Sequence, residues 1–389
     1  MSKMTKQVNK SAQIKTELLS YGVVPTEPFL KKYGAPFLEK RCAYGNPDDI
    51  RFQTYTLPQE LYLLPERLVC AVNIRSGSPW RLDWSKENNY FVYNENDHEQ
   101  KTQVSFPLRP SFYDTELPQG GAIQKYVTLY GGGSIGVFVN GNCSLSHMGL
   151  ACGFCSLAPN RSRQVEFPTV LTSHEVFEAL KIALSDYETP ITQVMINGGN
   201  FIDLDRGFLY YVDIVREARR AIDAVGRDVE LHLIVAPPKD LSLTSHLKGL
   251  NVSVAINLEV HDPELFARYC PGKHEVHGRD QVERALMACV DHLGPGKVYS
   301  IFVGGLEPIS NLVQGISQAA ESGIIPIINV FHPDPDTPLA KLPSPSPVEI
   351  IQMGCELQKI FTKHSFVKPF YLDCGRNSID TEAYRRLFT

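Results

Sequence analysis

Three of the nine cysteines gather in one short stretch of the chain, at Cys143, Cys152 and Cys155. Cys152 and Cys155 form a C-x-x-C pair, whose turn lets two thiolates meet one metal centre, and Cys143 joins them from upstream. Three thiolates can hold three irons of a [4Fe–4S] cluster and leave the fourth iron open for a chelating ligand. The spacing therefore predicts an iron–sulfur cluster on these three cysteines.

Two other chemistries fit parts of the same stretch. A structural zinc ion needs four ligands in a closed site, and His147 is available as the fourth. A redox C-x-x-C pair would use Cys152 and Cys155 alone and leave Cys143 without a role. The remaining cysteines are scattered, and in a cytosolic chain we expect them to be small buried hydrophobes rather than a disulfide framework. They are Cys42, Cys70, Cys270, Cys289, Cys355 and Cys374.

From about residue 134 onward the sequence alternates between short apolar runs and helical patterns. Each run is bounded by Gly, Pro or Asn, as expected of a parallel strand that is buried on both faces. Strands are expected at 135–140, 192–196, 231–236, 252–258, 298–303 and 325–331, and helices at 173–185, 208–225, 281–292, 312–321 and 347–362. The first of these helices opens at Ser173, a plausible N-cap. Six β/α units in series predict an α/β fold whose parallel sheet curls into a partial (β/α)6 barrel of the TIM type.

The first third of the chain has a different composition, rich in Pro, Tyr, Asn and charged residues. We expect an N-terminal α+β extension there, with a helix near 11–20, β-like runs at 68–74 and 89–93, and an exposed polar stretch at 94–101. The predicted parts are the extension at 1–130, the barrel at 131–345, and a C-terminal helix and tail at 346–389 that packs on the barrel. Because the extension leads directly into the cysteine-bearing strand, we expect it to help close the barrel mouth.

Polar and glycine-rich motifs follow the expected strands, at the strand ends where α/β barrels carry their chemistry. Asn197-Gly198-Gly199-Asn200 follows the second strand, and two glycines let the backbone approach a ligand closely. Asn257 and Glu259, at the fourth strand, alternate onto the same face, where a buried Glu needs a partner or a ligand. The fifth strand ends in Gly304-Gly305, and the sixth carries Asn329.

This arrangement resembles the radical S-adenosylmethionine (radical SAM) superfamily, whose signature is a three-cysteine loop after the first strand that ends in C-x-aromatic-C. Phe154 occupies the aromatic position, and the spacing is eight residues and then two, where three and then two is usual. The resemblance covers roughly 134–340 and is similar to biotin-synthase-like members. It implies that SAM binds the open iron and is cleaved by an electron from the cluster to methionine and a 5′-deoxyadenosyl radical. Such enzymes are oxygen-sensitive.

The resemblance also implies a set of SAM contacts. The Gly-Gly motif would meet the SAM amino group, with Asn200 in place of the usual Glu, and Asn257 and Glu259 would meet the ribose hydroxyls. Arg268, rather than Lys273, would meet the SAM carboxylate, because Lys273 reads as a surface charge. The implied cofactor-binding residues are Phe154, Asn197, Gly198, Gly199, Asn200, Asn257, Glu259, Arg268, Gly304 and Asn329. Asp336 stands where these members usually have Gly, and no catalytic residue is assigned.

The reaction class follows from motifs that the sequence lacks. It has neither a second cysteine cluster nor a D-x-H-x-x-G cobalamin motif, which disfavours sulfur insertion and cobalamin-dependent methylation. Hydrogen abstraction remains, leading to rearrangement, elimination or bond cleavage. We expect a small-molecule substrate, because barrel mouths suit small ligands, and a flavodoxin or ferredoxin as electron donor. Alternatives that stay open are a zinc-stabilised binding protein, a cluster-free barrel enzyme such as an aldolase, and a radical SAM enzyme acting on a peptide.

Composition bounds the partners and the location. The formal net charge of −5 argues against a nucleic-acid partner, since phosphate contacts need clustered Lys and Arg. The N-terminus has no apolar signal, and no run of about 18 apolar residues occurs that would span a membrane. We therefore expect a cytoplasmic protein.

Overall fold

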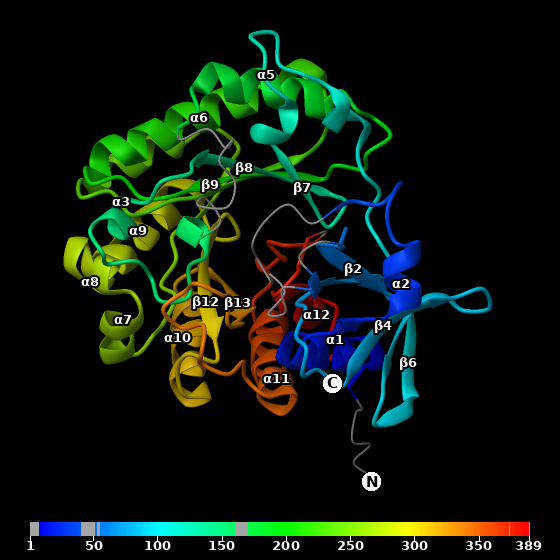
Figure 1. Ribbon diagram of the computed structural model, residues 1–389. Helices are drawn as coiled ribbons and strands as arrows, with labels where there is room; N and C mark the ends of the chain where they lie inside the picture. Colours follow the sequence, from blue (N-terminus) through cyan, green and yellow to red (C-terminus); the bar gives the residue numbers. More distant parts are fainter. Residues whose placement is uncertain (1–7, 40–50, 53–54, 160–169, 373, 389) are drawn as a thin grey trace.

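The barrel sheet contains seven strands in the order β13-β12-β11-β10-β9-β8-β7 (Figure 1). The computed structural model describes residues 8–39, 51–52, 55–159, 170–372 and 374–388. The strands are β7 (Thr128–Tyr130), β8 (Ser134–Asn140), β9 (Gln193–Gly198), β10 (Glu230–Ile234), β11 (Ser253–Ala255), β12 (Val298–Gly304) and β13 (Ile325–Val330). β8 to β13 pair in parallel, and β7 pairs antiparallel with β8. All six predicted strands are confirmed, although β11 is shorter than expected.

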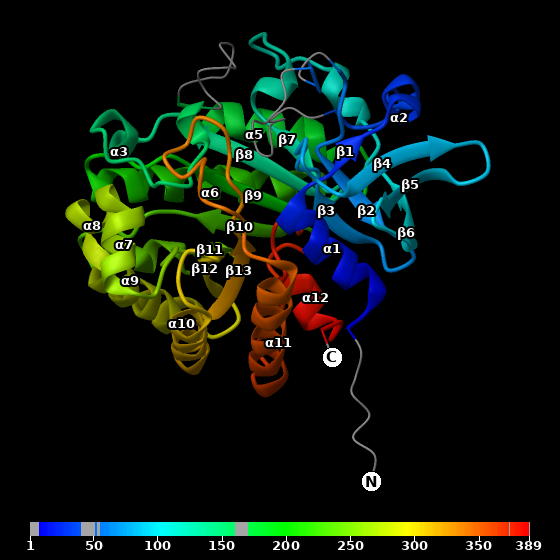
Figure 2. The same cartoon turned by 60° about the horizontal axis from the view of Figure 1, so that its bottom comes forward.

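Helices follow the barrel strands and lie on the outer side of the curved sheet (Figures 1 and 2). They are α3 (Ser144–His147), α5 (Ser173–Leu184), α6 (Leu204–Val225), η4 (Leu241–Leu247), α7 (Pro263–Tyr269), α8 (Pro271–Val276), α9 (Gly278–Leu293), α10 (Ile309–Glu321) and α11 (Pro347–Lys363). α5 begins at Ser173, as predicted, but its N-cap is Thr172 rather than Ser173, and Thr172 forms a capping box with Glu175. The helices bury their apolar stripes against the sheet, so that all seven residues of β12 are buried.

A second sheet of six strands, in the order β1-β4-β5-β6-β2-β3, forms the N-terminal part. Its elements are α1 (Lys10–Tyr21), β1 (Val24–Pro25), α2 (Glu27–Lys32), β2 (Glu60–Leu63), β3 (Leu68–Ala71), β4 (Trp80–Ser85), β5 (Asn89–Asn94) and β6 (Asp97–Ser105), followed by η2 (Ser111–Asp114) and η3 (Ile123–Lys125). The polar stretch 94–101 is largely exposed, as expected, but it forms part of a β-hairpin. It contains the turn and first half of the β5–β6 hairpin, with Asn94 buried and Lys101 paired with Tyr93.

The barrel sheet is open between β13 and β7, and the two ends of the chain meet at this opening (Figure 1). The C-terminal strap, which we define as residues 370–372 and 374–378, pairs with β13 through an Asn329–Ser378 bridge and a 2.9 Å hydrogen bond from Val330 N to Asn377 O. On its other side the Ala71 amide of β3 donates to Arg376 O at 3.2 Å. The strap therefore joins the N-terminal sheet to the open edge of the barrel.

A buried ion pair fixes the strap and the short helix α12 (Asp380–Tyr384) that follows it. Lys15 of α1 lies 2.8 Å from the Glu382 carboxylate, and both side chains are 1% exposed. The same ammonium donates to Gly375 O at 3.2 Å and to Ser378 O at 2.8 Å. The strap is thus held through its backbone by a residue near the start of the chain.

The predicted division at 130/131 and 345/346 stays a prediction. β7 belongs to the barrel sheet although it lies before the first boundary, and α11 begins just after the second. Among the described residues, no helix combines the length and apolar character that a bilayer crossing requires.

Candidate active site

The cysteine loop follows the end of β8, and its backbone contacts α7 and α8. Cys143 precedes α3, and Cys152 and Cys155 follow it in an irregular segment. Neighbouring elements hold this loop by its backbone. The Gly153 amide donates to Tyr269 O at 2.7 Å, and the Gly272 amide donates to Leu150 O at 3.1 Å. All three cysteines line one cavity of about 160 Å³, which we call the cysteine cavity.

The loop packs directly on the Gly-Gly motif at the end of β9. A Cβ on Gly199 would lie 2.0 Å from Asn142 O and 2.7 Å from Cys143 Cα, so only glycine fits there. The Ser144 amide also donates to Asn200 O at 2.9 Å. The motif therefore packs against the backbone at Cys143 and fixes its position. Gly198, Gly199 and Asn200 also line the cysteine cavity.

The surroundings of the three cysteines suit an iron–sulfur cluster. A hydrogen bond with the Cys270 thiol lowers the pKa of Cys152 against the opposing effect of burial, and the Lys273 ammonium lowers it further, which favours the iron-binding thiolate. Burial raises the pKa of Cys155 to about 12, so its proton must leave when iron binds. Among the described residues, no three His, Cys, Asp or Glu side chains are placed to hold a single metal ion. In a cluster each thiolate binds a different iron, so the sulfurs lie further apart than ligands of one ion.

His147, the fourth ligand of the zinc alternative, is exposed at the end of α3 and does not line the cysteine cavity. Cys270 is buried and contacts Cys152 instead. Cys270 is buried, as predicted, but its contact with Cys152 could not be predicted because Cys270 lies more than a hundred residues further along the chain.

A buried ion pair forms another wall of the cysteine cavity. Lys273 Nζ lies 2.6 Å from Glu259 Oε1, and the side chains are 16% and 8% exposed. Burial opposes the charge on Lys273, but the Glu259 carboxylate raises the pKa of Lys273 above its usual value, so the ammonium stays charged. The interpretation of Lys273 as a surface charge is therefore wrong. Conversely, Arg268 is exposed on α7, where its guanidinium lies 5.5 Å from the Tyr269 ring centroid, and it lines none of the cavities described here.

A larger cavity of about 320 Å³, the central cavity, continues from the cysteine cavity toward the barrel axis. Phe154, Asn197, Asn257, Glu259 and Asn329 all line it, as the sequence motifs led us to expect. The side-chain oxygens of Asn197 and Asn257 are buried and have no hydrogen-bond partner among the described residues. Buried polar atoms in a native site are normally paired, so these two oxygens are suited to a bound ligand.

Gly304 differs from the other predicted contacts. A Cβ there would lie 2.7 Å from Met353 Sδ and 2.8 Å from Ile328 Cγ2, so this glycine allows α11 to pack closely on the end of β12. It does not line any of the three cavities, whereas its neighbour Val303 lines the central one.

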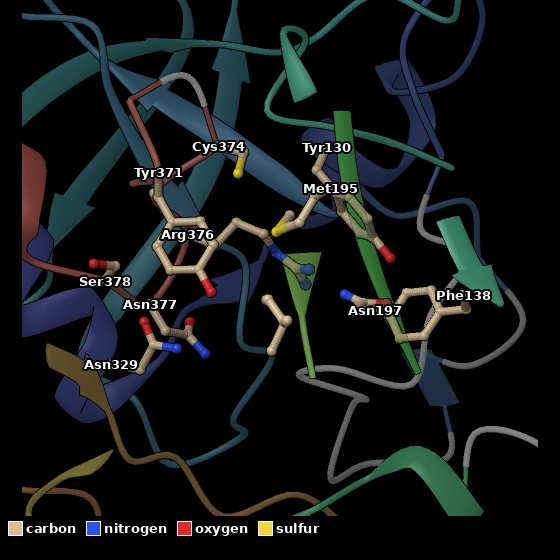
Figure 3. A pocket seen from close by; sticks show the side chains of 12 residues that line it. Tyr130, Phe138, Met195, Asn197, Asn329, Tyr371, Cys374, Arg376, Asn377 and Ser378 are labelled. Carbon is tan, nitrogen blue, oxygen red and sulfur yellow. The ribbon is translucent and has the colours of Figure 1, made fainter. Parts of the chain in front are cut away.

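A third cavity of about 190 Å³, the inner cavity, lies beyond the central one (Figure 3). Figure 3 shows Tyr371, Arg376, Asn377 and Asn329 on one side and Asn197 and Phe138 on the other. Seven of the described residues line both the central and the inner cavity, so the two are continuous. They include Tyr130, Asn197, Asn329 and Arg376. Sequence reasoning missed Tyr130, Tyr371, Arg376 and Asn377, because they come from β7 and the strap, which carry no motif.

Comparison with known proteins gives one curated relative. The chain is 26% identical over 246 residues to a bacteriochlorophyllide c C-7(1)-hydroxylase of Chlorobaculum limnaeum, and the match covers 59% of this chain and 60% of that protein. The chain thus spans less than two thirds of the length of this relative. No protein-family profile matches.

Two solved structures overlap parts of the chain. HydG, a maturase of the [FeFe]-hydrogenase, is 12% identical with a TM-score of 0.42, over 61% of this chain and 51% of that one. A radical SAM methyltransferase from Sphaerobacter thermophilus is 14% identical with a TM-score of 0.43, over 70% of each chain.

The partial barrel, the cysteine loop after its first parallel strand and the Gly-Gly motif on which the loop packs define a class of enzyme. They are features that the chain shares with the radical SAM superfamily. Members of this superfamily use a [4Fe–4S] cluster and SAM.

Proposed function

We propose that this chain binds a [4Fe–4S] cluster through Cys143, Cys152 and Cys155 and uses SAM to abstract hydrogen from a small molecule. The observation that carries the proposal is the continuity of three cavities: the cysteines line the first, orphaned Asn oxygens line the second, and a polar chamber forms the third. This order suits a cluster, SAM and a substrate in one row.

The cluster and SAM, when bound, supply a 5′-deoxyadenosyl radical that removes a hydrogen atom from the substrate. The residues of the chain do the positioning. Asn197 and Asn257 offer amide oxygens to SAM in the central cavity, and Glu259 faces the same space with its charge balanced by Lys273. Phe138, Ile301 and Val303 add apolar walls to the same space.

The electron donor and the substrate belong to the proposal as well. A flavodoxin or ferredoxin is the donor we expect. The inner cavity limits the substrate to a small molecule, since its volume is about 190 Å³. A peptide substrate would need a longer groove than this cavity of about 190 Å³, which lies between the barrel and the strap.

The test is anaerobic reconstitution of the full chain with iron and sulfide, followed by dithionite reduction and an assay for 5′-deoxyadenosine. The expected result is about four irons per chain and cleavage of SAM. Cys152→Ala should lose both. Cys355→Ala is the matched control, because Cys355 lies on α11 outside the three cavities and should behave as the wild type. One zinc per chain with intact SAM would overturn the proposal.

A further inference from the structure

The inner cavity has two chemically different walls (Figure 3). The strap and β13 contribute a polar wall of Tyr371, Arg376, Asn377 and Asn329, whereas β8, β9 and β10 contribute the apolar side chains Phe138, Met195 and Ile234. The cavity opens toward the central cavity, with which it shares Asn197 and Asn329. A molecule held here would present an apolar side to the barrel and a polar edge to the strap.

Among the residues that line the inner cavity, Asn377 offers the clearest unmet hydrogen-bonding capacity for a ligand. Its side chain is 4% exposed, and neither its amide nitrogen nor its amide oxygen has a hydrogen-bond partner among the described residues. Leaving a buried amide unpaired costs about 1–3 kcal/mol for each group. Asn377 is also fixed in place, since its backbone carbonyl accepts from Val330 N at 2.9 Å. A fixed, buried amide with a donor and an acceptor unmet is suited to a partner that offers both.

The electric charge of the chamber is already balanced. Arg376 is the only Asp, Glu, Lys, Arg or His among the described residues that line the inner cavity. Its Nε lies 3.2 Å from the buried Glu60 carboxylate, and its guanidinium lies 5.0 Å from the Tyr130 ring centroid. A carboxylate ligand would therefore add a negative charge with no further cation to offset it, and an ammonium would lie close to Arg376. Uncompensated charge in a buried site costs several kcal/mol.

Charged side chains that line the adjoining central cavity are also paired. Glu259 is paired with Lys273, and His332 Nδ1 lies 3.2 Å from Asp334 Oδ1. The chamber is thus polar without being ionic.

We propose that the inner cavity is the substrate site and that it takes an uncharged molecule about one six-membered ring in size, with an amide or hydroxyl edge that meets Asn377. The size follows from the volume of about 190 Å³, because an apolar cavity of about 150 Å³ holds benzene. This assignment rests on the proposed function, since it makes the molecule the one from which hydrogen is taken.

Three ring compounds of matched size and different charge test the proposal. Benzamide is neutral and carries both a donor and an acceptor, benzoate is an anion, and benzylammonium is a cation. Binding to the purified full chain is measured by calorimetry, and weak binding by ligand-observed NMR. Benzamide should bind at least tenfold more tightly than either ion. Equal or tighter binding of an ion, or no measurable binding of benzamide, overturns the proposal.

A variant pair locates the binding. Asn377→Leu keeps the side-chain size but removes the donor and the acceptor, and it should weaken benzamide binding by about tenfold, the effect of losing about 1.4 kcal/mol. Asn96→Leu is the matched control, because Asn96 is exposed in the turn between β5 and β6. A thermal melt of each variant establishes that it is folded. Unchanged benzamide binding by a folded Asn377→Leu protein would rule out this site.

The two proposals fail separately. Binding is measured on the protein before reconstitution and does not depend on a cluster, whereas the proposed function fails if the reconstituted wild type does not cleave SAM. A protein that cleaves SAM but prefers benzoate keeps the proposed function and refutes the uncharged substrate.

Discussion

Gly199 cannot gain a side chain without displacing the cysteine loop. In Gly199→Ala the new Cβ would lie 2.0 Å from Asn142 O, and ordinary van der Waals contact begins at 3.4 Å, so the two must separate by 1.4 Å, the difference between these distances. The obstructing atoms are backbone and cannot swing aside. Overpacking of this kind costs about 1–3 kcal/mol, and we expect the upper end of that range.

Urea denaturation measures this loss, and the iron content after reconstitution measures its effect on the site. Because Cys143 Cα lies 2.7 Å from the same Cβ position, the loop must move where it carries a proposed cluster ligand, and we expect Gly199→Ala to retain less than half of the wild-type iron. Gly34→Ala is the control, since nothing lies within 4 Å of a Cβ there. If Gly199→Ala is as stable as Gly34→Ala and binds as much iron, the close approach of β9 to the cysteine loop is refuted.

Two further perturbations act on stability. Lys15→Met leaves the buried Glu382 carboxylate without its cation and should lower the free energy of unfolding by about 3–5 kcal/mol. The double variant Lys15→Met/Glu382→Leu should recover most of that loss. Equal urea midpoints for the wild type and both variants would contradict this reasoning. Burial lowers the pKa of His277 from 6.5 to about 4, so the unfolded chain takes up this proton more readily and stability falls as the pH drops below 6.5. Between pH 7.5 and 5.0 this one residue should contribute a loss of about 2 kcal/mol in the protein before reconstitution, and His277→Gln should lose correspondingly less over the same range.

The strands and the cysteine site follow from local patterns. Each barrel strand is a buried apolar run closed by Gly, Pro or Asn, so its position is written in a few adjacent residues. The strand-end rule then places Cys143, Asn197 and Asn257 at one edge of the sheet without further information. The structure brings these three residues to connected cavities.

The parts that could not be predicted depend on pairing between distant segments. Arg376 belongs to the irregular strap, and its place opposite Glu60 follows from packing of the C-terminal strap on the N-terminal sheet. Lys273 follows Pro271 and Gly272 and looks like a surface charge, but the start of α8 turns it toward Glu259. Arg268 is the penultimate residue of α7 and is exposed. No periodicity in the sequence distinguishes these two cations.

The hairpin at 94–101 could not be predicted from the sequence for a different reason. Its residues are mostly polar because Glu95, Asn96, Asp97 and Glu99 are exposed, so neither face shows the alternation of a half-buried strand. Hydrogen bonds to the neighbouring strand, rather than burial, define this element.

The closure of the barrel by both ends of the chain affects the order in which parts of the protein can form during synthesis on the ribosome. Lys15 and Glu382 are 367 residues apart in sequence, and their contact seals the side of the chamber that Arg376 and Asn377 line. Contacts of such long range form late and slowly, because a large loop must close first. A nascent chain that has emerged as far as His277 therefore contains all the described residues that line the cysteine cavity, whereas the strap that lines the inner cavity is still to be synthesised. The proposed metal site and the proposed substrate site would thus be completed at different stages of synthesis.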